Sequence, residues 1–317
     1  MNHATSPAIH QLSQLPEQVT TDDSRQQAAE KQFPVRIPDA FADLIDWNNP
    51  ADPLLAQVLP DPREMTGPGS KDPVGELDAR QAGGLVHKYA GRALLVVTSS
   101  CDIHCRYCFR RHFPYADEAP PQQRWVDAVD YLVEHPEVTE VILSGGDPLT
   151  LSNRRLQALG TELRRLPQLR RLRIHSRTPV VKPQRVDKPL LQWLSDLPWP
   201  TSLVLHCNHA NELGSSATAA LAELRSTGVS LLNQSVLLKG VNDDVQTLVA
   251  LSENLFDIGV LPYYLHLLDP VQGAAHFALT QAQARPLIEQ MRQRLPGYLV
   301  PRLVCDPGGT PSKQIIA

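Results

Sequence analysis

Short runs of apolar residues recur along most of the chain, separated by polar, turn-forming segments. Six of them have the length and continuous apolar character of strands buried on both faces: Ala93–Thr98, Glu140–Leu143, Leu172–His175, Ser202–His206, Ser230–Ser235 and Tyr263–Leu268. After the first gap their centres lie about 30 residues apart, the length of one strand-plus-helix unit. Six such units predict a parallel α/β sheet, most simply a partial (βα)6 barrel.

The stretches between these runs carry the three- and four-residue apolar spacing of amphipathic helices. Helices are expected at Val126–Glu134, Arg154–Leu166, Lys188–Leu197, Ser215–Thr227, Asp244–Ile258 and Gln281–Leu295, and Arg302–Cys305 is a candidate closing strand. Residues 1 to 35 are polar and weakly periodic, which predicts a loosely ordered or short-helical leader. We therefore divide the chain into a partly ordered N-terminal extension, residues 1–75, and a barrel with a C-terminal tail, residues 76–317.

Length and charge narrow the classes of protein that fit. A chain of 317 residues suits one large α/β unit or two small domains. Lys and Arg number 30 against 34 Asp and Glu, so the basic excess of a nucleic-acid-binding protein is missing. The longest apolar run, Ala93–Val97, has five residues, against the roughly 20 of a membrane helix, and no secretory signal is visible. These features favour a cytoplasmic protein without a membrane or nucleic-acid partner.

The most unusual residues follow the predicted strands. The segments Ser144–Pro148, Ser176–Pro179, Asn208–Glu212, Asp269–Pro270 and Asp306–Gly309 all begin where a strand ends. In barrel enzymes the carboxyl ends of the strands form the active-site face. Turn chemistry accounts for the glycines, prolines and asparagines in these loops. It accounts neither for the cysteines after the first strand nor for Arg177.

Three cysteines stand within eight residues of that first loop: Cys101, Cys105 and Cys108. A four-iron cluster usually takes four cysteines, so three would leave one iron open for a chelating ligand. The alternatives are a zinc ion held with His104 or His112, or buried free thiols. Two further cysteines also end strands, and each could supply a fourth ligand or be a small core residue; they are Cys207 and Cys305.

The segment Cys101-Asp102-Ile103-His104-Cys105-Arg106-Tyr107-Cys108 resembles the signature of the radical S-adenosylmethionine superfamily. The resemblance implies a partial (βα)6 barrel whose [4Fe–4S] cluster binds S-adenosylmethionine at its open iron and cleaves it to a 5′-deoxyadenosyl radical. Ser144-Gly145-Gly146-Asp147 is similar to the glycine-rich motif of that superfamily. It implies that Gly145, Gly146 and Asp147 bind S-adenosylmethionine near its methionyl amino group.

Further segments resemble the lysine 2,3-aminomutase branch of that superfamily. They are Cys108–Tyr115, Ser176–Val181, His266–Phe277 and Asp306–Lys313, of which the first and third are closest to enzymes serving the (R)-β-lysylation of bacterial elongation factor P. The resemblance implies pyridoxal 5′-phosphate carried on Lys313. Its phosphate would be held by Tyr89 and Arg92, with Lys88 where the branch has arginine. From sequence position alone, Lys313 reads as a solvated tail lysine.

The same resemblance implies the substrate contacts. Arg110 matches the arginine that binds the substrate carboxylate, a role suited to a planar guanidinium. Asp269 and Asp306 match two carboxylates that hold the ε-ammonium of lysine. Without the resemblance, Arg110 reads as a surface residue and the two aspartates, each before a proline, as turn starters. Two carboxylates in one pocket favour a cationic substrate over glutamate.

The resemblance as a whole implies an L-lysine 2,3-aminomutase that makes (R)-β-lysine, an isomerase. Its expected partners are a one-electron donor such as flavodoxin or ferredoxin and, in the same pathway, elongation factor P. One alternative is an aminomutase for another amino acid or β-amino acid pool. A second, from a different class, is a non-catalytic iron–sulfur or zinc protein. Clostridial-type relatives continue past this lysine with a tail bearing zinc-binding cysteines, whereas this chain stops four residues after Lys313, so their zinc-linked oligomer is not assumed.

Overall fold

Seven parallel strands form the centre of the computed structural model, which describes residues 8–20, 23–115, 121–310 and 312–317. They follow one another in chain order: β3 (Arg92–Thr98), β4 (Glu140–Gly145), β5 (Arg171–Ser176), β6 (Thr201–Leu205), β7 (Ser230–Leu237), β8 (Leu261–Leu267) and β9 (Arg302–Cys305). The antiparallel strands β2 (Leu85–Tyr89) and β1 (Arg80–Gln81) extend one side, and β10 (Gln314–Ile315) extends the other. Within the described residues β1 and β10 do not pair, so the barrel is partial.

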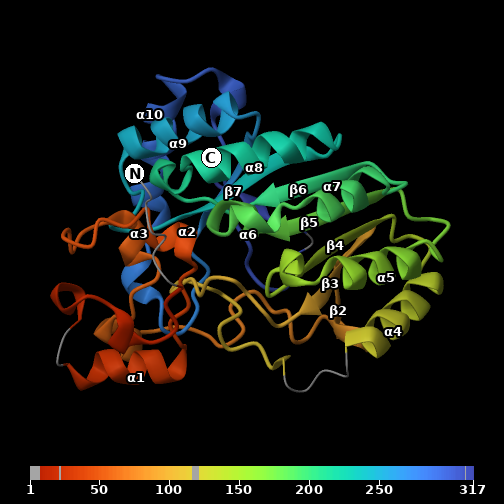
Figure 1. Cartoon of the computed structure of the whole chain (residues 1–317), viewed down its shortest axis with the longest axis horizontal. Coiled ribbons are helices and arrows are strands. Elements are labelled where there is room, and N and C mark those ends of the chain that lie inside the picture. The colour runs from red at the N-terminus through yellow and green to blue at the C-terminus, as the bar shows by residue number, and fades with distance from the viewer. Residues whose placement is uncertain (1–7, 21–22, 116–120, 311) are drawn as a thin grey trace.

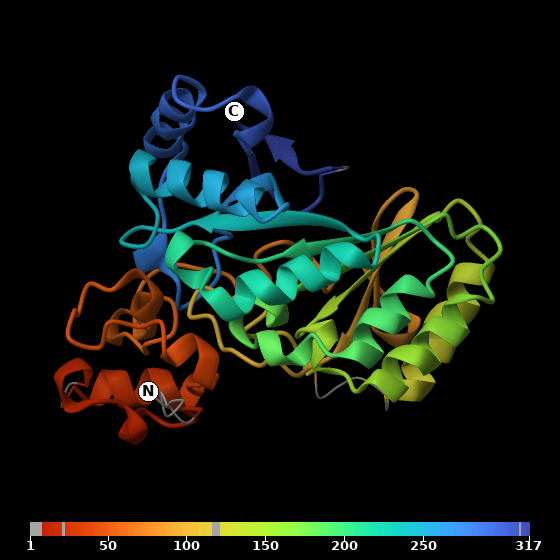
Figure 2. The same cartoon turned by 45° about the horizontal axis from the view of Figure 1, so that its top comes forward.

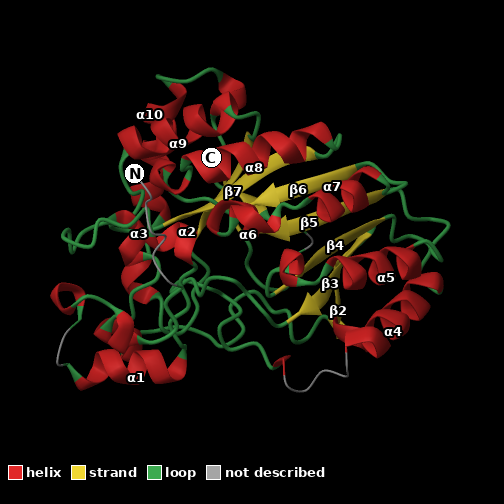
Figure 3. Cartoon of the chain, in the orientation of Figure 1, coloured by secondary structure: helices red, strands yellow, loops and turns green. Residues whose placement is uncertain are grey.

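Helices follow the strands and cover their outer face. They are α4 (Pro121–Val133), α5 (Asn153–Leu163), α7 (Lys188–Ser195), α8 (Ser215–Ser226), α9 (Val245–Asp257) and α10 (Gln281–Arg292), with the short α6 (Thr178–Val181) after β5. Figures 1 and 3 show α5, α7 and α8 lying across the sheet. The buried faces of the helices, such as Leu156, Leu159 and Leu163 of α5, complete the core. The predicted α/β partial barrel is confirmed, and the element bounds differ from the expected ones by a few residues.

The N-terminal extension folds onto the barrel. It contains α1 (Ser24–Gln32), α2 (Asp39–Ala42), α3 (Pro53–Ala56) and several 3₁₀ turns. Of the predicted leader, residues 1–35, the described part is short-helical, with α1 and two 3₁₀ turns. Apolar side chains of this segment, including Ile9, Leu12 and Val35, join the same core cluster as the barrel strands. In Figure 2 the extension, red to orange, lies at the end of the strands away from α4 and α5.

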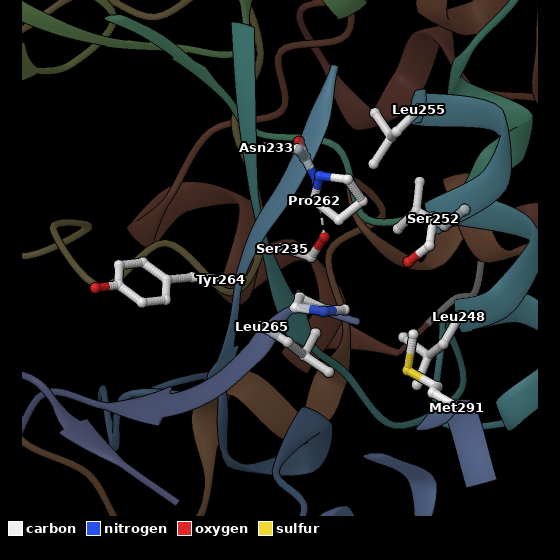
Figure 4. A pocket seen from close by; sticks show the side chains of 11 residues that line it. Asn233, Ser235, Leu248, Ser252, Leu255, Pro262, Tyr264, Leu265 and Met291 are labelled. Carbon is white, nitrogen blue, oxygen red and sulfur yellow. Dashed lines mark hydrogen bonds between the residues drawn. The ribbon is translucent and has the colours of Figure 1, made fainter. Parts of the chain in front are cut away.

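A small cavity of about 10 Å³ separates β7 and β8 from α9 (Figure 4). It lies within the sheet–helix layer, and the hydrogen bond from Asn233 Nδ2 to Ser235 Oγ, 2.9 Å, is beside it. Its volume accommodates about one water molecule, so it is a packing gap and not a ligand site. No helix of the described residues is long and apolar enough to cross a membrane.

Candidate active site

The parallel strands bring their following loops together at one edge of the sheet. The cysteine loop, residues 99–110, follows β3, and the glycine motif, residues 144–147, follows β4. Arg177 follows β5, Asp269 comes two residues after β8, and Asp306 follows β9. Residues far apart in sequence therefore meet where the sequence predicted an active site.

The three cysteines of the loop lie close enough to affect one another. Burial raises the pKa of the Cys108 thiol to about 11, and the nearby Cys105 contributes in the same direction. Burial also raises the pKa of Cys101, followed in effect by Cys108. In the described part of the chain, no three Cys, His, Asp or Glu side chains are grouped to hold a single metal ion. The three thiols are partly buried, and their grouping in one loop fits an iron–sulfur cluster held by thiolates.

The two histidines of the zinc alternative are both bonded outside the cysteine group. His104 Nδ1 lies 2.8 Å from the carbonyl oxygen of Pro34. His112 Nε2 lies 3.1 Å from the carbonyl oxygen of Gln272. Each contact ties the ring to a distant backbone segment, so both histidines brace the cysteine loop.

Buried ion pairs from the N-terminal extension hold the cysteine loop. Arg106, between the second and third cysteines, is fully buried and donates through Nε and Nη2 to Glu64 at 2.8 and 2.5 Å. Arg111 donates to the same carboxylate at 2.6 Å. The backbone amide of His104 adds a bond to the carbonyl of Arg36, 2.9 Å. The loop is therefore fixed to the extension before any ligand binds.

The glycine motif needs its glycines because it lies directly against the start of this loop. Gly145 has a φ of 115°, and a Cβ there would come within 2.6 Å of the Thr98 carbonyl oxygen. A Cβ at Gly146 would come within 2.3 Å of the Ser100 carbonyl oxygen. Instead, the amides of Gly146 and Asp147 donate to those two carbonyls at 2.7 Å each. The motif therefore fixes the backbone from which the cysteine loop departs.

The side chain of Asp147 is occupied by protein donors. Its carboxylate accepts from Ser176 Oγ and the Arg177 amide, both at 2.7 Å, and from the amides of Thr178 and Leu149. Burial raises its pKa in spite of these four bonds. Asp147 therefore ties the glycine motif to the loop after β5.

Arg110 lies inside the site and not on the surface. It is 7% exposed and donates through Nε and Nη2 to the Glu76 carboxylate at 2.7 and 2.6 Å. Its Nη1 donates to Ser144 Oγ at 2.8 Å and to the Gly145 carbonyl at 3.2 Å. These four bonds leave one of the five guanidinium N–H groups for a ligand. The bidentate edge expected to bind a substrate carboxylate is thus taken by Glu76.

Sequence reasoning missed Glu76. It belongs to the loop before β1, and its amide donates to Asp72 Oδ1 at 2.9 Å. The contact with Arg110 joins residues 34 positions apart, and the side chain is 7% exposed. A lone glutamate in a Pro- and Gly-containing loop carries no periodic signal, so only the folded chain reveals it.

Lys313 lies beside the carboxylate of Asp306. Its Nζ donates to Asp306 Oδ2 at 2.7 Å, and the other oxygen accepts from Lys88 Nζ at 2.7 Å and Tyr89 OH at 2.8 Å. The Arg92 guanidinium lies over the Tyr89 ring, 4.3 Å from its centroid. The structure therefore brings together Lys313, the predicted phosphate-binding groups and one of the two predicted substrate carboxylates.

The two aspartates have opposite electrostatic settings. Burial alone would raise the pKa of Asp306, but Lys313, Lys88 and Tyr89 outweigh it and lower the pKa to about 2. Burial raises the pKa of Asp269 to about 7, against a smaller opposing effect of Lys313. Asp269 accepts no side-chain hydrogen bond from the residues that the structure describes. Its carboxylate lies at the same edge of the sheet as Lys313.

Comparisons with known proteins agree with this arrangement. A model of the radical SAM superfamily matches residues 95–251. The L-lysine 2,3-aminomutase of Escherichia coli K12 is 48% identical over 288 residues, which cover 90% of this chain and 84% of that protein. The L-lysine 2,3-aminomutase of Clostridium subterminale is 39% identical over 283 residues, covering 88% of this chain and 68% of that protein.

Solved structures add support for the fold. Streptococcus suis SuiB bound to S-adenosylmethionine has a TM-score of 0.51 at 14% identity, covering 69% of this chain and 51% of that one. A radical SAM methyltransferase from Sphaerobacter thermophilus has a TM-score of 0.50 at 17% identity, covering 70% of this chain and 68% of that one. The chain belongs to the L-lysine 2,3-aminomutase family of the radical SAM superfamily, and is an isomerase whose cofactors are a [4Fe–4S] cluster, S-adenosylmethionine and pyridoxal phosphate.

Proposed function

We propose that this protein converts free L-lysine to (R)-β-lysine, with the cluster on Cys101, Cys105 and Cys108 and pyridoxal phosphate on Lys313. The observation that carries the proposal is the arrangement of Lys313 with two carboxylates, Asp269 and Asp306, at the strand edge that also bears the cysteine loop. When bound, the cofactors supply the radical and the delocalising ring that migration of an amino group requires. The protein binds and orients the reactants.

The cationic groups around Asp306 suit a phosphate. Lys88, Tyr89 and Arg92 lie together at the turn between β2 and β3, and Lys88 and Tyr89 both donate to Asp306. A phosphate dianion placed there would accept the same donors. Because lysine is a point charge and not a planar fork, Lys88 would contribute attraction without the bidentate geometry of arginine.

The carboxylates suit the ammonium group of lysine. Asp269 is half-buried and accepts no side-chain hydrogen bond from the described residues, so an arriving ammonium would both pair with it and favour its ionised form. Arg110 offers its remaining N–H to the substrate carboxylate, held in place by Glu76. A glutamate side chain would instead meet Asp269 and Asp306 with like charge.

We place the reaction in the cytoplasm and upstream of the β-lysylation of elongation factor P, with flavodoxin or ferredoxin as electron donor. The segments Cys108–Tyr115 and His266–Phe277 support the link to elongation factor P because they resemble those of the enzymes that serve it. All five cysteines are free thiols, which fits a reducing compartment.

An anaerobic assay tests the proposal. Reconstituted protein is mixed with free L-lysine, S-adenosylmethionine, pyridoxal phosphate and dithionite, and β-lysine is scored by chromatography. β-Lysine with little net loss of S-adenosylmethionine is the expected result. Deoxyadenosine without β-lysine would make lysine the wrong substrate; glutamate, arginine and lysylated elongation factor P would then be compared. Neither product, from protein with a verified cluster, would favour a non-catalytic iron–sulfur protein.

A further inference from the structure

Turn-forming residues are common after a strand, but this does not explain Arg177. Its side chain packs against the cysteine loop. It follows β5, is 5% exposed, and places Nη1 at 2.8 Å from Cys105 Sγ. The same nitrogen lies 2.7 Å from Tyr107 OH, in the residue between the second and third cysteines. Both contacts fall on the segment proposed to hold the cluster, and neither involves the lysine-binding groups.

The guanidinium is held rigidly by buried partners. Its Nη2 donates to Gln57 Oε1 at 2.7 Å and to Glu212 Oε2 at 2.9 Å, and both of these residues are fully buried. The Arg177 amide is bonded to Asp147 at 2.7 Å. The side chain is therefore fixed from its backbone to its tip and cannot turn away from Cys105.

The donor count leaves Arg177 little capacity for a soluble ligand. Its four Nη hydrogens serve Cys105, Tyr107, Gln57 and Glu212. Only Nε lacks a partner among the described residues, and it is buried. Substrate binding thus does not account for this arginine. A permanent contact with Cys105 does, because it places the guanidinium charge next to the sulfur.

A hydrogen bond from a cation to a cluster thiolate has a defined electrostatic effect. Reduction adds negative charge to the cluster, and donors to the ligand sulfurs stabilise that charge. The stabilisation is strong where water is excluded. Glu212 offsets part of the cationic charge, but it bonds Nη2, while Nη1 faces the sulfur.

We infer that Arg177 is a positioning residue for the cluster: it fixes the Cys105 thiolate and raises the reduction potential of the cluster. The inference rests on the proposed assignment of Cys105 as an iron ligand. In this view the contact between Arg177 and Cys105 acts on electron uptake by the cluster, the step before any substrate reacts. A cluster that accepts an electron more readily is better matched to a one-electron donor protein.

A redox titration of the reconstituted cluster, followed by electron paramagnetic resonance, tests this inference. It uses protein without lysine, S-adenosylmethionine or pyridoxal phosphate, so its result is independent of the aminomutase assay. The Arg177→Lys variant keeps a charge but loses the fork that reaches both Cys105 and Glu212. At the wild-type midpoint we expect its reduced-to-oxidised ratio to fall about tenfold, which is 59 mV for one electron.

Two further variants sharpen the test. The double variant Arg177→Gln, Glu212→Gln removes both buried charges of this ion pair and so leaves no unpaired buried charge, which keeps the test available if a single variant does not fold. The reduction potential of its cluster should also fall. Lys182→Gln is the matched control, because Lys182 pairs with Asp102 at 2.8 Å next to Cys101 but its side chain is 40% exposed. Its potential should stay near that of the wild type. An unchanged potential in folded, iron-replete Arg177 variants would overturn the inference and leave Arg177 a structural residue.

Discussion

The cysteine loop and the lysine tail (residues 306–317) lie at the same edge of the sheet but are held in opposite ways. The loop is anchored by Arg106 and Glu64, both with fully buried side chains, and by backbone bonds to the N-terminal extension. The tail pairs with β9 through the two-residue β10, and the Lys313 side chain is 28% exposed with Asp306 as its ion-pair partner. The cysteine loop is therefore fixed by buried ion pairs, whereas the Lys313 side chain is held by one ion pair that can exchange.

This difference matches the chemistry proposed for each end. A cluster needs a fixed ligand set, because its ligands do not leave during turnover. A lysine that carries a cofactor must release it to the substrate amine and take it back. Asp306 can hold the Lys313 ammonium while the lysine is free, which keeps the side chain in the pocket.

The largest effect is expected from a substitution in the buried ion pairs that anchor the cysteine loop. Glu64→Gln leaves Arg106 and Arg111 without the buried carboxylate that both contact. Breaking a buried ion pair costs about 3–5 kcal/mol, so we expect a lower free energy of unfolding and reduced iron loading. Urea unfolding and iron analysis measure both.

The chain offers a matched control for this prediction. Arg63 and Asp61 form a pair next to Glu64 in sequence, but the Arg63 side chain is 67% exposed. Arg63→Gln should cost less than about 1 kcal/mol and leave iron loading unchanged. Equal effects of the two substitutions would mean that the buried network does not anchor the loop.

The second prediction concerns the Lys313 amine. Lys313→Ala should abolish covalent trapping of pyridoxal phosphate by borohydride, because the proposed amine is gone. Stability should change by less than about 1 kcal/mol, since the lost pair is partly exposed, and the iron content should stay the same. Peptide mass spectrometry after borohydride reduction locates the modified residue. Lys239, an exposed lysine in another strand-end loop, serves as the control through Lys239→Ala, which should retain trapping.

The third prediction concerns pH. The folded-state pKa of Asp269, about 7, is above its ordinary value, so burial favours the protonated form. In the ligand-free protein, protonated Asp269 therefore contributes to the free energy of unfolding at low pH, and this contribution is lost as the pH rises toward 7. An ammonium ligand needs the ionised form, so lysine affinity should fall roughly tenfold per pH unit below 7. Lysine KM measured between pH 5.5 and 8 checks the slope.

Two controls isolate the ammonium contact. Norleucine, which is lysine without its ε-amino group, should show no such slope. Asp269→Asn should flatten the lysine profile and raise KM at pH 8. A slope that survives this substitution would assign the titration to another group, and Asp306 is a poor candidate because its pKa is about 2.

The sequence predicted the barrel well because its signals are local. Continuous apolar runs and helical spacing placed the six strands, the closing strand β9 and six helices within a few residues. The cysteine spacing and the glycine pair were likewise readable from neighbouring residues. These features depend on contacts within one element or one loop.

What the sequence left open depends on contacts between distant segments. Leu12 and Leu15 join the core although their segment has little periodicity. Glu76 reaches Arg110 from a loop with no motif, and the Arg177 contact joins β5 to a sulfur 72 residues earlier. Such pairs follow only from the way the extension and the strand ends meet in the fold.

The smallest expected effect sharpens the boundary between the two regions. Cys305 ends β9, and burial raises its pKa with contributions from Asp269 and Asp306, residues of the lysine end. The largest effects on the pKa values of Cys101 and Cys108 come from burial and from residues other than Cys305. Cys305→Ser should therefore leave iron content unchanged and cost less than about 0.5 kcal/mol. A loss of iron in this variant would make Cys305 the fourth ligand that the sequence allowed, and would join the two ends into one metal centre.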